Sequence, residues 1–167
     1  PDFGPVVRRE HILNVARLGG AALTLICAPP GYGKSVLAAQ LIAESVAEGC
    51  LWIPLYDTDV RGDEWWLRIA EALSPACPES SATSDPRLQF DPDPARGEAV
   101  LRVREGLRNH GDQDFGIVLD GANRIGNLTP FVELADLLRR HAAPRSRVIV
   151  TCRSVSRDLT VPDPALV

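Results

Sequence analysis

A short glycine-rich turn between two apolar segments constrains the fold of this chain more than any other feature. Residues 23–27, LTLIC, form a short apolar run with β-branched members, which is typical of a strand buried on both faces. The segment from Ser35 to Gly49, SVLAAQLIAESVAEG, has apolar residues at helical spacing, and we expect a helix that Gly49 terminates. A buried strand that turns through glycines into a helix predicts the first unit of a parallel α/β sheet.

The same alternation of short apolar strands and helices continues along the chain. Strands are expected at 50–56, 115–120 and 147–153, with residues 158–161 as a candidate for one more. Helices are expected at 9–19, 63–73, 98–111 and 129–142. Residues 74–97 carry five prolines and several Ser and Asp residues, so we expect a long, mobile loop there. The pattern predicts one domain over residues 1–167, a P-loop NTPase-like three-layer αβα sandwich with a mainly parallel sheet.

Composition and net charge disfavour some classes of function. The net charge of −4 over 167 residues does not favour a nucleic-acid-binding face. No apolar run approaches the roughly 18 residues that span a bilayer, so we expect no membrane partner. The chain begins at Pro1 and contains no Met, which we interpret as a piece of a longer protein. Lys34 is the only lysine among 18 basic residues, and a chance position between Gly33 and Ser35 is a poor explanation for it.

The four cysteines are scattered and form no C-x-x-C pair. Cys27 and Cys152 end apolar strand-like runs, where we expect small buried thiols. A zinc site or a disulfide framework favours closer, paired spacing. The free thiols agree with a reducing, cytoplasmic compartment.

Residues 28–35, APPGYGKS, match the phosphate-loop pattern G-x-x-x-x-G-K-[ST] except at Ala28. In that loop, successive backbone N–H groups surround a phosphate and the helix N-terminus adds positive potential. Pro29 and Pro30 have no N–H, so the donors must begin at Gly31. Lys34 is expected to reach the β- and γ-phosphate oxygens, and Ser35 to bind Mg²⁺. The alternative is a glycine-rich turn without ligand, which the flanking elements and the single lysine disfavour.

Asp120 ends the apolar run FGIVLD and is expected to be the second Mg²⁺ ligand. The alternative for it is an ordinary turn aspartate, since Asp-Gly is a common turn pair. Many hydrolysing relatives place a second carboxylate at the next position, where this chain has Gly121. Asp57 and Asp59 are the nearest substitutes, with ordinary loop acids as the alternative, and Arg153 could sense the γ-phosphate or be a solvated arginine.

Four segments, APPGYGKSVLAAQ, LWIPLYDTD, IVLDGANRI and VIVTCRS, together resemble the nucleotide-binding domain of the STAND class of signal-transduction ATPases. Within that class the chain resembles the MalT-type large LuxR-family transcription regulators, whose phosphate loop commonly begins with alanine. After the first helix, the strand-and-acid pattern of the family is matched by Trp52, Leu55 and Asp59, and an aromatic residue usual in the family by Trp65. Arg9, with Ile12 and Leu13, resembles the entry segment that contacts the base, and Arg153 falls on the family's strand-end arginine. Pro30 and Gly121 depart from the family pattern.

The resemblance implies an ATP/ADP-binding switch with Mg²⁺, followed in the full-length protein by helical and winged-helix, sensor and helix-turn-helix domains that bind DNA. Gly121 favours weak or absent hydrolysis, and nucleotide-dependent self-association is possible. The residues expected to contact nucleotide are Arg9, Pro30, Gly31, Tyr32, Gly33, Lys34, Ser35 and Val36. Lys34 and Asp120 are the catalytic candidates, with Asp59 and Arg153 as secondary ones. A small-molecule kinase and a nucleotide-free protein-binding scaffold are the alternative functions.

Overall fold

The computed structural model describes residues 22–45, 49–55, 64–73, 94–110 and 114–160. Four strands and four helices lie in these ranges. In chain order they are β1 (Leu23–Cys27), α2 (Lys34–Ser45), β2 (Gly49–Pro54), α3 (Glu64–Leu73), α4 (Pro94–His110), β3 (Phe115–Asn127), α5 (Thr129–His141) and β4 (Arg147–Thr160).

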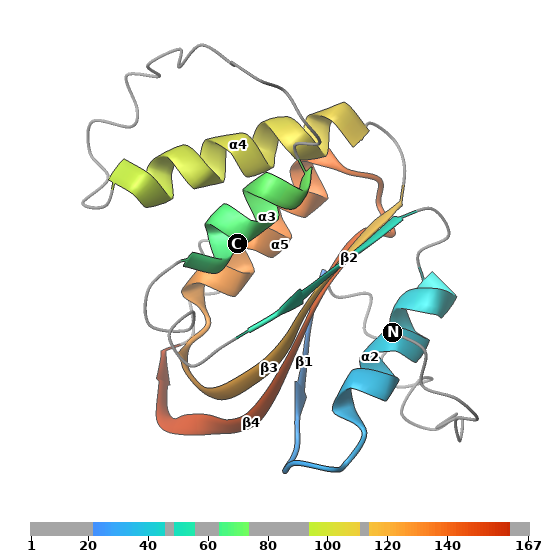
Figure 1. Cartoon of the computed structure of the whole chain (residues 1–167), viewed down its shortest axis with the longest axis vertical. Coiled ribbons are helices and arrows are strands. Elements are labelled where there is room, and N and C mark those ends of the chain that lie inside the picture. The colour runs from blue at the N-terminus through green and yellow to red at the C-terminus, as the bar shows by residue number, and fades with distance from the viewer. Residues whose placement is uncertain (1–21, 46–48, 56–63, 74–93, 111–113, 161–167) are drawn as a thin grey trace.

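The strands form one parallel sheet in the order β1-β4-β3-β2. Helix α2 covers one face of this sheet, and α3 and α5 cover the other with α4 packed beyond them (Figure 1). The protein is therefore an α/β three-layer sandwich of the P-loop NTPase type, as the sequence predicted. In such sheets ligands bind at the carboxyl ends of the strands.

Each face of the sheet has its own hydrophobic core. Between α2 and the sheet, Leu37, Leu41 and Ile42 pack against Val118 and Ile149. The opposite core is larger, because three helices contribute to it. Its centre contains the stacked side chains of Trp65, Trp66 and Phe131, with ring centroids 4.6 and 5.3 Å apart. Both strands that carry the site, β3 and β4, are thus buried on both faces along their first halves.

Strand β3 continues beyond the point where the sequence predicted its end. Asp120 was expected to be the last residue, but β3 runs on to Asn127 and stays paired with β4. The register shifts by one residue between Leu119 and Ala122, so Asp120 and Gly121 form a β-bulge. Strand β2 ends its pairing at Asp120 and β1 at Cys152. Asp120 therefore still lies at the carboxyl edge of the four-stranded part of the sheet.

Three other boundaries differ from the predictions. Helix α4 begins at Pro94, whereas residues 94–97 were assigned to the loop, because proline is well tolerated in the first turn of a helix. Gly49 begins β2 instead of ending a helix, since its backbone pairs with Phe115. Residues 158–160 belong to β4 and do not start a separate strand. The predicted helix at 9–19 and the loop residues 74–93 lie outside the described residues.

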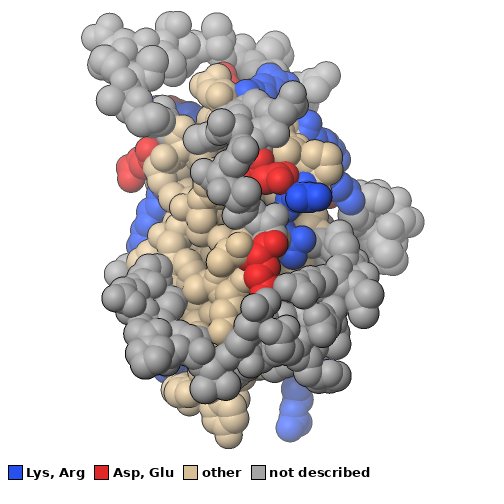
Figure 2. Space-filling model, turned by 90° about the vertical axis from the view of Figure 1, so that its right-hand side faces the viewer, with Lys and Arg blue, Asp and Glu red and all other residues tan. Residues whose placement is uncertain are grey.

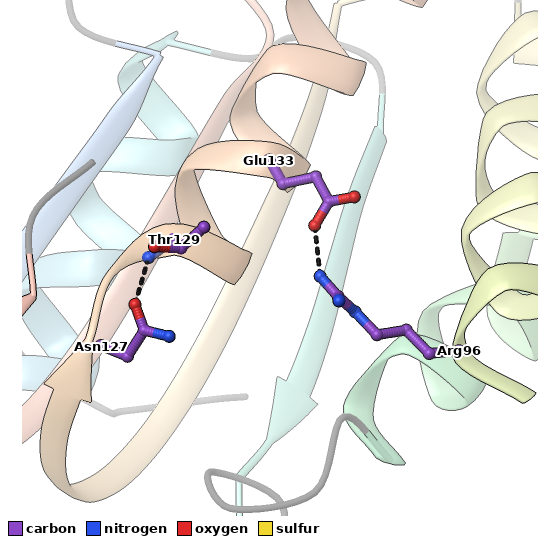
Figure 3. Close-up of polar contacts among 4 residues, drawn as sticks. All are labelled: Arg96, Asn127, Thr129 and Glu133. Carbon is purple, nitrogen blue, oxygen red and sulfur yellow. Dashed lines mark hydrogen bonds and ion pairs between the residues drawn. The ribbon is translucent and has the colours of Figure 1, made fainter. Parts of the chain in front are cut away.

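Two polar contacts fix α5 relative to its neighbours (Figure 3). The side-chain oxygen of Asn127 accepts a hydrogen bond of 2.9 Å from the Thr129 backbone N–H at the start of α5. Arg96 in α4 contacts Glu133 in α5 at 2.5 Å. The first contact joins the end of β3 to the start of α5, and the second joins α4 to α5 on the face of the sheet opposite α2.

On the face drawn in Figure 2, acidic and basic side chains of the described residues lie next to one another near the centre. Among the described residues, no helix is long and apolar enough to cross a membrane.

Candidate functional site

The loop between β1 and α2 has a backbone shape that only glycine adopts without strain. Gly31 and Gly33 have φ angles of 82° and 72°, in the left-handed region. A Cβ atom at Gly31 would meet nothing within 4 Å, so backbone conformation, not space, requires the glycine. The loop is tied down at its start, where the Ala28 N–H donates to the Cys152 carbonyl at 3.2 Å. Local backbone chemistry therefore fixes the curl predicted for a phosphate loop.

The first turn of α2 presents backbone donors to this loop. The Leu37 N–H donates to the Gly33 carbonyl at 2.9 Å and closes the first helical turn. Helix geometry provides no acceptor within α2 for the N–H groups of Lys34, Ser35 and Val36, which precede that bond. These groups and the helix dipole create positive potential at the loop. The arrangement suits an anion such as a phosphate group.

The lysine side chain lies over the same loop. The Lys34 ammonium donates to the Pro29 carbonyl at 3.0 Å, so its charge lies beside the segment that the prolines form. Pro30 and Gly31 are exposed, and Tyr32 is 62% exposed. The loop surface is therefore open to solvent in the described part of the chain.

A serine, an aspartate and a threonine from three different elements meet beside the loop. Ser35 Oγ donates to Asp120 Oδ1 at 3.0 Å. Thr151 Oγ1 donates to the same oxygen at 2.5 Å. Thr151 is fully buried, whereas Ser35 and Asp120 are half-buried. Two hydroxyl groups thus hold the same carboxylate oxygen and orient Asp120.

The backbone of the β-bulge orients Asp120 further. The Leu55 N–H donates to the Asp120 carbonyl at 2.7 Å. The Gly121 N–H donates to Thr151 Oγ1 at 2.9 Å, so this hydroxyl accepts one bond while it donates another to Asp120. Gly121 has a φ of 100°, which L side chains rarely adopt. The bulge therefore requires glycine at the position where a second acid was considered.

The oxygen atoms of Ser35 and Asp120 are hard ligands of the kind that Mg²⁺ prefers. They lie within hydrogen-bonding distance of each other at the phosphate loop, which fits Mg²⁺. No group of three or more His, Cys, Asp or Glu side chains suited to a metal occurs among the described residues. Mg²⁺ commonly takes one or two protein ligands and fills its other positions with water and substrate phosphates, so two ligands are sufficient.

Some of the other predicted site residues lie near the loop, and others lie outside the described residues. Arg153 is exposed and lies two residues beyond Thr151, hence on the same face of β4. Val36 is half-buried in the first turn of α2. Arg9, Asp57 and Asp59 lie outside the described residues. Sequence reasoning gave no role to Thr151, although a polar residue inside the apolar run RVIVTCR was the available signal.

The buried thiol expected at Cys27 is not found, because Cys27 is exposed at the end of β1. Cys152 is buried, as predicted.

Comparison with known proteins finds a similarity to mycobacterial proteins. The chain is 30% identical over 139 residues to the serine/threonine-protein kinase PknK of Mycobacterium tuberculosis and of Mycobacterium bovis. The match covers 81% of this chain but only 12% of each relative. The chain therefore spans about one eighth of the length of these curated relatives. No protein-family model matches the chain.

Proposed function

We propose that this chain is an ATP/ADP-binding regulatory switch domain of a larger cytoplasmic protein, with slow or absent ATP hydrolysis. The observation that carries the proposal is the contact of Ser35 Oγ with Asp120 Oδ1. Ser35 follows directly after a glycine-rich loop that ends in Lys34. A loop that binds nothing has no need for a serine, a carboxylate and the only lysine at one edge of the sheet.

Each group has a separate role in binding. Backbone N–H groups from Gly31 to Val36 receive the β-phosphate, with Gly31 and Gly33 providing the curl. Lys34 moves from the Pro29 carbonyl to the phosphate oxygens and neutralises their charge. Ser35 and Asp120 would hold Mg²⁺, which supplies further neutralisation when bound. Thr151 holds the Asp120 carboxylate in the orientation that this requires.

The geometry of the bulge is the basis for proposing slow hydrolysis. Position 121 has no side chain, and the Gly121 N–H is engaged by Thr151. No carboxylate beside Asp120 is then available on β3 to orient an attacking water. A switch requires only that the two nucleotides bind its conformations with different affinities, not rapid turnover.

The wider assignment rests on sequence resemblance. We propose that the chain belongs to the STAND class and is closest to the MalT-type LuxR regulators, with sensor and DNA-binding domains elsewhere in the full-length protein. The kinase activity in the name of the mycobacterial relatives is not carried over, because the matched region is 12% of their length. The G-K-S loop also differs from the G-x-G-x-x-G loop of protein kinases.

The test is thermal unfolding of the chain with Mg²⁺ and either ADP or ATP. At a ligand concentration of about 100 Kd, binding stabilises the folded state by roughly 2.7 kcal/mol. For a domain of this size we expect the midpoint to rise by roughly 5–10 °C. Lys34→Ala should abolish the shift, whereas Arg145→Ala, which removes an exposed cation near the start of β4, should retain it.

Three outcomes separate the alternatives. No shift with the parent protein, with its folding verified by circular dichroism, contradicts nucleotide binding and supports the scaffold. Transfer of phosphate to an added small-molecule acceptor supports the kinase. A shift without transfer, lost in Lys34→Ala only, supports the switch.

A further inference from the structure

Cys27 and Cys152 are direct neighbours in the sheet, although 125 positions (152 − 27) separate them in sequence. They are the last register partners of the parallel β1 and β4 pair. Neighbouring strands lie about 4.8 Å apart, and side chains at partner positions project from the same face. Disulfides need Cα atoms roughly 4.4–6.8 Å apart, a range that includes the usual spacing of neighbouring strands.

The two thiols differ in their access to solvent. Cys27 is exposed at the end of β1, whereas Cys152 is completely buried. The thiols share a hydrogen bond, and burial together with Cys27 raises the pKa of Cys152 to about 12. Lys34 acts in the opposite direction and lowers the pKa of Cys152. The Cys27 thiol is thus accessible to a reagent in solution, and the buried Cys152 thiol is in contact with Cys27.

We propose that Cys27 and Cys152 form an oxidisable dithiol site that closes to an intramolecular disulfide beside the phosphate loop. The oxidant is a small soluble disulfide. The Cys27 thiolate attacks one of its sulfurs, a mixed disulfide forms and one thiolate leaves. The Cys152 sulfur then attacks Cys27 and the second thiolate leaves. In total the two cysteines lose two electrons and two protons, and the oxidant becomes two thiols.

The contact with Cys27 that raises the pKa of Cys152 changes once Cys27 is in the mixed disulfide. The hydrogen bond and the thiolate charge that Cys27 contributes are then removed, whereas burial, the largest cause, still raises the pKa of Cys152 and Lys34 still lowers it. Thiolate formation at Cys152 becomes easier at the moment when it must act as the nucleophile. The order of reaction, Cys27 first and Cys152 second, follows from this and from their exposure.

The proposed disulfide would lie at the start of the phosphate loop. The Ala28 N–H, one residue after Cys27, already donates to the Cys152 carbonyl at 3.2 Å. A disulfide adds a covalent connection to this single hydrogen bond and fixes the first residue of the loop to β4. The inference concerns the thiols alone and stands whether or not the loop binds nucleotide.

The experiment treats the folded chain with oxidised glutathione, stops exchange with acid, and alkylates the remaining thiols in denaturant. Intact mass and peptide mapping then identify the linked residues. We expect a loss of two hydrogens, alkylation of two of the four cysteines, and a Cys27–Cys152 peptide. Cys50→Ser, which removes another exposed thiol, should leave the link unchanged. Cys152→Ser should instead accumulate a glutathione adduct at Cys27.

Oxidation of the parent protein tests the proposal even if the Cys152→Ser variant fails to fold. A stable glutathione adduct on Cys27 of the parent, or a disulfide from Cys27 to Cys50 or Cys77, overturns the proposal. So does complete alkylation of all four cysteines after oxidation.

Discussion

Ser35 Oγ donates a hydrogen bond of 3.0 Å to Asp120 Oδ1, although the two residues lie 85 positions apart in the sequence. The contact exists because α2 begins directly after the loop that follows β1, while β2 stops pairing at the bulge in β3. It joins the first turn of a helix to the edge of a sheet. Together with Thr151, it leaves the Asp120 carboxylate oriented toward the phosphate loop.

Replacing Asp120 with Asn should separate nucleotide binding from its dependence on Mg²⁺. The amide retains an oxygen that Ser35 and Thr151 can contact, but it loses the negative charge that a divalent cation needs. We expect the Mg²⁺-dependent gain in ADP affinity to fall by about 10-fold or more. Titration calorimetry with Mg²⁺ and with EDTA measures it. Asp136→Asn, which changes the carboxylate paired with Arg139 in α5, is the control and should bind like the parent; equal Mg²⁺ dependence in both variants contradicts the metal role.

Thr151→Val should lower the free energy of unfolding and leave the Asp120 carboxylate less firmly oriented. The substitution keeps the shape of the side chain but removes the hydroxyl that accepts from the Gly121 N–H and donates to Asp120. Leaving a buried donor without its acceptor costs about 1–3 kcal/mol. Urea denaturation should show this loss, and Thr151→Ser should recover most of it. Ser154→Ala, which removes an exposed hydroxyl bonded to the Asn123 carbonyl, should change the free energy of unfolding by less than about 0.5 kcal/mol.

The ion pair between Arg96 and Glu133 should contribute more than an exposed pair on the same helix. Their side chains are 25% and 38% exposed and connect α4 to α5, as Figure 3 shows. Arg102 and Glu98, at 55% and 57%, form an i,i+4 pair within α4. We expect double-mutant coupling of about 1 kcal/mol for the first pair and about 0.3–0.5 kcal/mol for the second. Equal coupling in urea denaturation would show that the α4–α5 connection gains nothing from its partial burial.

The order of strands and helices was predictable because each element depends on local patterns. The run LTLIC predicted β1, and the periodic apolar residues after Ser35 predicted α2. Lys34, Ser35 and Asp120 could be selected as candidates because phosphate-loop spacing is strict and because Asp120 follows a run of buried residues. These features need no knowledge of distant contacts.

Features that depend on pairing between distant segments were not predictable. The extension of β3 past Asp120 depends on pairing with residues of β4 that come 30 or more positions later, such as Cys152 opposite Ala122. The same dependence hid the role of Thr151, which is defined only by its contacts with Asp120 and Gly121. Cys27 was expected to be buried because its run is apolar, but β1 has β4 as its one partner among the described strands. Burial at a strand end depends on its neighbours, not on its own sequence.

Gly121 is the position where sequence and structure suggest different experiments. The sequence suggests that Gly121→Asp or Gly121→Glu raises phosphate release by supplying a second acid. The structure adds a cost, since φ is 100° and a side chain there costs roughly 1–2 kcal/mol. Space is not the obstacle, because a Cβ atom would lie 3.5 Å from the Leu55 carbonyl oxygen. We therefore expect Gly121→Ala to lower the free energy of unfolding by that amount without changing phosphate release. Gly121→Asp should show a similar loss in urea denaturation, and its release rate should be compared with that of Gly121→Ala. An alanine variant as stable as the parent would mean that the bulge does not require glycine.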